Sequence, residues 1–117
     1  MIQQILDELI ASLPGSRAVV FLDNDGETIS LSGVYGGDVK LLGAWKEIHL
    51  HHIREITARL GLGAVHAVLF SLEEGIELIV PVTRDYCLLL FLSSLANVQD
   101  ALAGLRLAVE RLRQDIE

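Results

Sequence analysis

The most strongly patterned stretch of the chain runs from residue 38 to residue 60, where apolar side chains recur at the spacing of an α-helix. We predict one helix of about six turns here. The Asp38 carboxylate can cap the N-terminus of this helix, and Gly61 suits the left-handed backbone position that often follows a helix C-terminus. The apolar positions of the helix are Val39, Leu41, Leu42, Trp45, Ile48, Leu50, Ile53, Ile56 and Leu60.

At 100° per residue these positions spread over an arc of roughly 200°, which is wider than the stripe of about 100° that a helix needs in order to cover one sheet. The helix therefore has apolar surface for two neighbours. We expect its own sheet to be one of them, and a second copy of the chain is the candidate for the other. The polar positions that fall opposite, on an expected solvated face, are Lys40, Glu47, His51, Arg54 and Glu55.

Seven shorter segments carry apolar patterns of their own, two of them helical and five strand-like. The helical segments are residues 2–13 and about 95–115, the second with Ser94 as its predicted N-cap. The predicted strands are residues 17–22, 27–33, 64–72, 76–82 and 86–92. Short turns between neighbouring strands favour antiparallel pairing. We therefore predict one α+β domain, residues 1–117, of order αββαβββα: a three-layer α-β-α sandwich with a five-stranded antiparallel sheet.

Two of the strands indicate where they lie in this sheet. Residues 86–92 show no polar alternation, which is typical of a central strand covered on both faces. Residues 27–33 alternate, with Ile29 and Leu31 on one face and polar side chains on the other, so we expect a half-exposed strand at or near an edge.

Composition and charge narrow the possible partners. The net charge of −7 opposes binding to nucleic acid, so no nucleic acid is expected as a partner. No run of about 18 apolar residues occurs, so we expect no insertion into a membrane. Cys87 is the single cysteine and cannot form an internal disulfide, which favours a reducing compartment and a cytoplasmic location.

No residue pattern predicts catalysis, a metal site or a cofactor. His49 and His52 share one side of the long helix and could supply two metal ligands, but no third ligand is evident. Packing in the core or at an interface is therefore favoured, and both histidines should be partly buried at the sheet or at the dimer seam.

Residues 23–26 resemble the start of a calcium loop without its later ligands and predict a hairpin turn. Cys87 has no histidine partner in the sequence and predicts a buried structural thiol. No phosphate-binding glycine loop is present.

Taken in order, the chain resembles the Roadblock/dynein light chain domain family over essentially all 117 residues. The resemblance begins with the leading amphipathic helix and the hairpin PGSRAVVFLDNDGETIS. It continues through the long helix and residues 62–65 to the segment EEGIELIVPVTRDYCLLLFLSSLANV. It implies a sheet related to the profilin and longin folds, and homo- or heterodimers formed through the long helix and the third strand. Members act as non-enzymatic partners, among them dynein light chains and scaffolds or regulators of small GTPases, and they share no catalytic residues.

The pattern and the resemblance together predict a non-enzymatic dimeric adaptor that binds a small Ras-like GTPase or another Roadblock- or longin-type protein, with no catalytic residue, no metal and no cofactor. The predicted dimer interface consists of Leu41, Leu42, Trp45, Ile48, His49, His52, Ile56, Val65 and Ala67. The predicted partner surface consists of Lys40, Glu47, His51, Arg54 and Glu55.

Two other functions are compatible with the same pattern. One is a structural light chain of a motor or scaffold complex. The other is a small-molecule sensor, because related sandwiches bind ligands between sheet and helix. A ligand pocket needs polar groups that point into the core, and residues 76–82 and 88–92 offer almost none, so interaction is favoured over sensing.

Overall fold

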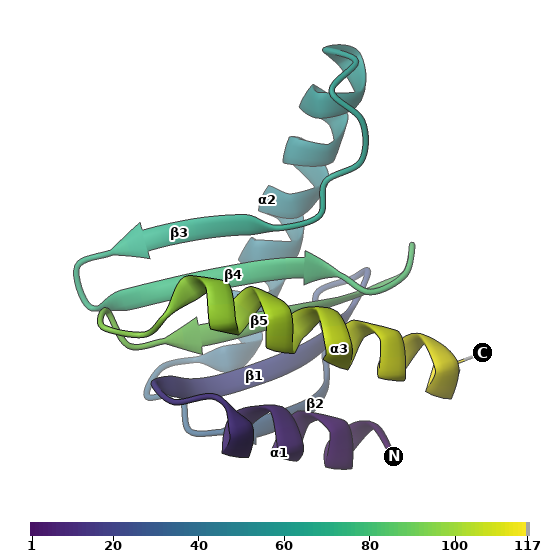
Figure 1. Cartoon of the computed structure of the whole chain (residues 1–117). Helices are drawn as coiled ribbons and strands as arrows, with labels where there is room; N and C mark the ends of the chain where they lie inside the picture. The colour runs from purple at the N-terminus through teal and green to yellow at the C-terminus, as the bar shows by residue number, and fades with distance from the viewer. Residues whose placement is uncertain (117) are drawn as a thin grey trace.

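The computed structural model describes residues 1–116, except for the side chains of residues 39 and 40. Helices α1 and α3 lie on one face of a five-stranded sheet and α2 lies on the other (Figure 1). The elements are α1 (Ile2–Ser12), β1 (Ser16–Asp23), β2 (Thr28–Gly33), α2 (Val39–Arg59), β3 (Val68–Leu72), β4 (Gly75–Pro81), β5 (Tyr86–Leu92) and α3 (Val98–Ile116). The predicted α+β sandwich of order αββαβββα is confirmed. Within the described range, no helix combines the length and the apolar character that crossing a membrane requires.

The strand order in the sheet is β2-β1-β5-β4-β3, and every neighbouring pair is antiparallel. Strand β5 lies at the centre, and all of its side chains except that of Tyr86 are buried, as its unbroken apolar run predicts. Strands β2 and β3 form the two edges, which confirms the edge position predicted for β2.

The sheet has a separate apolar core on each face. On one face α1 and α3 each contribute several fully covered side chains, such as Leu6 and Leu105. On the other face, among the side chains of α2 that the structure describes, Leu50 is the one apolar side chain that is fully buried. Helix α2 is therefore held to the sheet with much less apolar burial than the other two helices.

The ends of α2 agree with the sequence prediction. The Asp38 carboxylate accepts a hydrogen bond from the Leu41 N–H at 3.2 Å, which satisfies one of the free amides of the first turn. Gly61 has a φ of +68°, the left-handed conformation that glycine adopts without strain. In Figure 1 the C-terminal end of α2 rises well past the β3 edge of the sheet.

The third strand is shorter than predicted, because it begins at Val68 and not at residue 64. Val68 pairs with Ile79, two residues before Pro81, which has no amide hydrogen to donate to a longer ladder. Residues 61–67 form the connection that brings the chain back from the far end of α2 to the sheet (Figure 1).

The last helix begins at Val98, not near residue 95, and the predicted cap at Ser94 is wrong. Asn97 is the capping residue, since its Oδ1 accepts a hydrogen bond from the Asp100 N–H at 3.0 Å. Leu95 continues the helical spacing of the sequence but is almost fully exposed, in the turn between β5 and α3.

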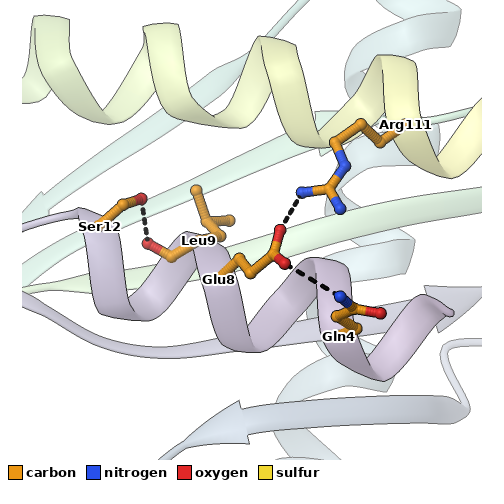
Figure 2. A network of polar contacts seen from close by, with 5 residues as sticks. All are labelled: Gln4, Glu8, Leu9, Ser12 and Arg111. Carbon is orange, nitrogen blue, oxygen red and sulfur yellow. Dashed lines mark hydrogen bonds and ion pairs between the residues drawn. The ribbon is translucent and has the colours of Figure 1, made fainter.

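A polar contact joins α1 to α3 on the outer side of the core that these two helices form with the sheet (Figure 2). Arg111 donates from Nη1 to the Glu8 carboxylate, and Gln4 donates to the same group at 3.2 Å. The hydrogen bond from Arg111, followed by that from Gln4, lowers the pKa of Glu8 below its usual value of 4.5. Because the folded pKa is the lower one, this contact stabilises the fold fully above pH 4.5, and its contribution disappears as the pH falls through the folded pKa.

We expect acid to weaken the fold less when Glu8 is replaced by glutamine. The measurement is urea unfolding of the parent and of Glu8→Gln at pH 5 and pH 3. The parent should lose more stability over this interval, because only the parent must protonate a Glu8 carboxylate that is hydrogen-bonded in the folded state. Equal losses in the two proteins would mean that the contact between α1 and α3 contributes nothing.

Candidate functional site

A stripe of exposed side chains follows the side of α2 that points away from the sheet. Trp45 is 54% exposed and Ile48 is 46% exposed, whereas Leu50, on the opposite side of the helix, is fully buried. The members of this stripe, here called the outer face, are Leu41, Trp45, Ile48, His49, His52 and Ile56. A contiguous apolar surface with a tryptophan and several branched residues is typical of an interaction site.

The inner face of α2, which packs on the sheet, carries charged side chains. Lys46 Nζ lies 2.8 Å from Glu77 Oε2 on β4, and the two side chains are only 11% and 12% exposed. The same ammonium lies 3.9 Å from the centre of the Phe70 ring on β3, a cation–π contact. Cys87 on β5 donates its thiol hydrogen to Glu47 Oε2, with 3.1 Å between the heavy atoms.

The polar inner face explains why so much apolar surface of α2 remains exposed. The charged groups with partners on the sheet occupy the inner side together with Leu50, so the remaining apolar side chains of the helix point outward. Burial raises the pKa of the Cys87 thiol well above its usual value, and the hydrogen bond to Glu47 raises it further. The thiol therefore stays protonated as a hydrogen-bond donor and is not a nucleophile.

Several side-chain positions on α2 differ from the sequence prediction. Glu47 and Arg54 are half-buried, so their predicted place on a solvated face is wrong, while His51 and Glu55 are exposed. The Lys40 side chain lies outside the described residues.

An aromatic contact between His49 and Phe70 joins the outer face to the sheet edge. The Trp45 and His49 rings are 6.2 Å apart between centroids, and the His49 and Phe70 rings are 6.1 Å apart. His49 and His52 are both exposed in the single chain, so the sheet does not bury them, and their burial at a dimer seam stays a prediction. Because Phe70 belongs to edge strand β3, the outer face and this edge form one continuous surface.

Strand β3 contributes an exposed residue to this surface that the sequence prediction did not include. Leu72 is exposed on the same face of the sheet as Phe70, whereas Leu69 is exposed on the opposite face, where its partner Leu78 belongs to the core beneath α1 and α3. The strand pairs only with β4, so its other side is a sheet edge. The sequence prediction chose Val65 and Ala67 because it placed both within the strand, whereas both precede it. The strand alternation of residues 68–72 would have placed Leu72 on the same face as Phe70 had the start of β3 been known.

The structure gathers most of the predicted interface residues but not all of them. Leu41, Trp45, Ile48, His49, His52 and Ile56 lie together on the outer face, and Ala67 is exposed near the start of β3. Leu42 and Val65 are half-buried and pack against the core between α2 and the sheet, so they are not exposed members of this surface.

An open groove of about 1900 Å³ lies beside the C-terminal half of α2. One wall is α2 itself, where His51 and Glu55 line the groove, and another is formed by His66 before β3. The turn between β4 and β5 contributes Arg84 and Asp85. Four of the five predicted partner-surface residues line this groove: Glu47, His51, Arg54 and Glu55.

The described side chains can be checked for the metal sites that the sequence raised. Nowhere among them do three or more histidine, cysteine, aspartate or glutamate residues come together as a metal site would require. Residues 23–26 form the predicted turn, in which the Asp23 carboxylate accepts hydrogen bonds from the N–H groups of Asp25 and Glu27 at 2.9 and 3.0 Å.

The sequence matches no protein-family model and no curated protein sequence. Solved structures nevertheless share the fold over nearly the whole chain. A Roadblock/LC7 domain from Streptomyces avermitilis is 18% identical with a TM-score of 0.89, covering 97% of this chain and 96% of that one. MglB from Myxococcus xanthus is 14% identical with a TM-score of 0.90, covering 98% and 94%. Acanthamoeba castellanii profilin IA is 15% identical with a TM-score of 0.69, and each chain is covered completely.

Proposed function

We propose that this chain, which has the Roadblock/LC7 fold, belongs to that family and acts in the cytoplasm as a non-enzymatic dimeric regulator of a small Ras-like GTPase. The observation that carries the proposal is the outer face of α2, an exposed apolar stripe that continues through His49 onto edge strand β3. The sequence resemblance supplies the second part, because it implies that domains of this kind hold or regulate small GTPases.

The outer face supports a homodimer with a two-fold axis. In such a dimer the same surface is used by both copies, so each outer face would cover the other. The free side of β3 would lie at the same seam, where an unpaired edge can bind a second chain. Trp45, the largest exposed side chain of the stripe, is the natural anchor of this interface.

The groove beside α2 supports a site for the GTPase. Its lining combines apolar and charged side chains, as transient protein interfaces do. Ile48 and His52 belong both to the groove and to the outer face, so a partner in the groove would contact residues next to the dimer seam. Regulation in this proposal works by contact, and no side chain of this protein takes part in hydrolysis.

We expect the isolated protein to bind no GTP, and a GTP-loaded Ras-like GTPase to bind it through the groove. Replacing Arg84 by alanine should weaken that complex by about 1 kcal/mol, roughly fivefold, the usual contribution of a rim charge. Calorimetry with GTP and magnesium ion, and then with a panel of small GTPases, measures both quantities.

The matched control is Arg106→Ala, which removes an exposed arginine from α3 on the opposite side of the sheet. Micromolar binding of GTP by the protein alone would contradict the proposed function. So would the absence of binding to every GTPase of the panel.

A further inference from the structure

Edge strand β2 exposes its apolar side chains and covers its polar ones, the reverse of the usual arrangement. Ile29 is 46% exposed and Leu31 is 37% exposed, whereas Ser32 is only 9% exposed. Ser32 donates to Asp7 of α1 at 2.7 Å, and Ser30 donates to Gln3 of the same helix. Helix α1 therefore covers the serine side of the strand through hydrogen bonds.

The exposed pair lies on the face of the sheet that carries α2. Leu31 is paired with Val20, whose side chain belongs to the core on that face. Ile29 has no partner in the register, because the pairing passes from Ser30 directly to Thr28, as in a β-bulge. Helix α2 crosses this face: Lys46 contacts β3 and β4, and Ala44 approaches Gly26 in the turn before β2. The side chains of Ile29 and Leu31 nevertheless remain exposed.

The exposure of Ile29 and Leu31 gives up apolar burial that a different pairing register of β2 would provide. Side chains alternate along a strand. A shift of the β1–β2 pairing register by one residue would therefore turn Ile29 and Leu31 toward the core beneath α1 and α3, and the serines toward solvent. Local choices that oppose stability are expected mainly where function requires them. The exposed pair is therefore better explained as a contact surface than as an accident of packing.

The charge around the pair indicates which partner it fits. Residues 18–39 contain four acidic side chains and no lysine, arginine or histidine, and Asp25 and Glu27 are exposed next to Ile29. A second copy would bring like charges together in a chain whose net charge is already −7. Addition of a strand is also disfavoured, because Gln3 Nε2 already donates to the Leu31 carbonyl at 2.9 Å.

We propose that Ile29 and Leu31, with the acidic turn formed by residues 23–27, form a docking site for a partner protein whose contact surface has apolar side chains framed by lysine and arginine. The exposed pair lies at the sheet edge opposite β3, so pairing of two copies through β3 would not cover it. The acidic turn lies nearer to α2, because Gly26 approaches Ala44 closely and Asp25 also lines the groove beside that helix. The docking site goes beyond the proposed function, and it does not depend on whether that partner is a GTPase.

The test uses a fluorescent amphipathic peptide of leucine and lysine as the probe, with fluorescence anisotropy at low salt. We expect the full-length protein to bind it, and Ile29→Thr/Leu31→Thr to weaken binding at least about fivefold. Threonine keeps the strand propensity, so this variant should retain the far-ultraviolet spectrum of the parent. Asp25→Asn/Glu27→Gln should weaken binding as well and reduce its dependence on salt, without touching the apolar pair.

Two controls test whether binding depends on this site and on the positive charge of the peptide. Leu107→Gln removes a leucine that is 64% exposed on α3 and should leave the affinity unchanged. A peptide with glutamate in place of lysine should not bind. The proposal is overturned if the lysine peptide does not bind, if neither double variant weakens it, or if only Ile48→Glu on the outer face does.

Discussion

Replacing Ile48 with glutamate should convert the protein from a dimer to a monomer at micromolar concentration. Ile48 lies on the outer face and is 46% exposed in the single chain, so the substitution leaves the core of the monomer intact. In the proposed dimer the same position is covered, and the two-fold axis places two unpaired carboxylates at the seam. Such a change should cost about 3 kcal/mol or more, which is at least roughly 100-fold in the dissociation constant.

Sedimentation equilibrium of the parent and the variant measures this effect directly. Leu107→Glu is the matched control, because it places the same charge at an exposed leucine on α3, away from the outer face. This control should remain dimeric. A monomeric parent, or equal dissociation constants for the parent and Ile48→Glu, would rule out the outer face as the dimer interface.

Replacing Lys46 with alanine should destabilise the fold by about 3–5 kcal/mol, the usual cost of removing one partner from a buried ion pair. The variant leaves the Glu77 carboxylate nearly covered and without its cation. Apart from the Lys46 ammonium, Glu77 Oε2 has no hydrogen-bond partner among the described residues. The cation–π contact with Phe70 is lost as well.

Urea unfolding of three proteins tests the role of this ion pair: the parent, Lys46→Ala and Lys46→Met/Glu77→Leu. The double variant replaces both charges with apolar side chains of similar size, so it should be close to the parent in stability. This comparison separates the cost of an unpaired charge from the loss of packing. A Lys46→Ala variant as stable as the parent would mean that water already solvates Glu77 in the folded protein.

The sequence alone determined the order of the elements and most of their ends, because those features depend on neighbours along the chain. Helix α2 is specified by its own apolar spacing and by Asp38 and Gly61 at its ends. Strand β5 is specified by an unbroken apolar run between two turns. The start of β3 was not specified in this way, because it depends on the point at which β4 can still pair, close to Pro81.

Only the tertiary structure decided how α2 is rotated about its own axis. The helical period gives the angles between side chains, but it does not say which side meets the sheet. The rule that apolar side chains face inward places Glu47 in solvent, yet it packs inward beside Lys46. Their partners, Cys87 and Glu77, lie on strands that are distant in sequence, so no local pattern contains these pairs. The outer face stays exposed in the single chain because Leu50 and the charged side chains with partners on the sheet occupy the inner side of the helix.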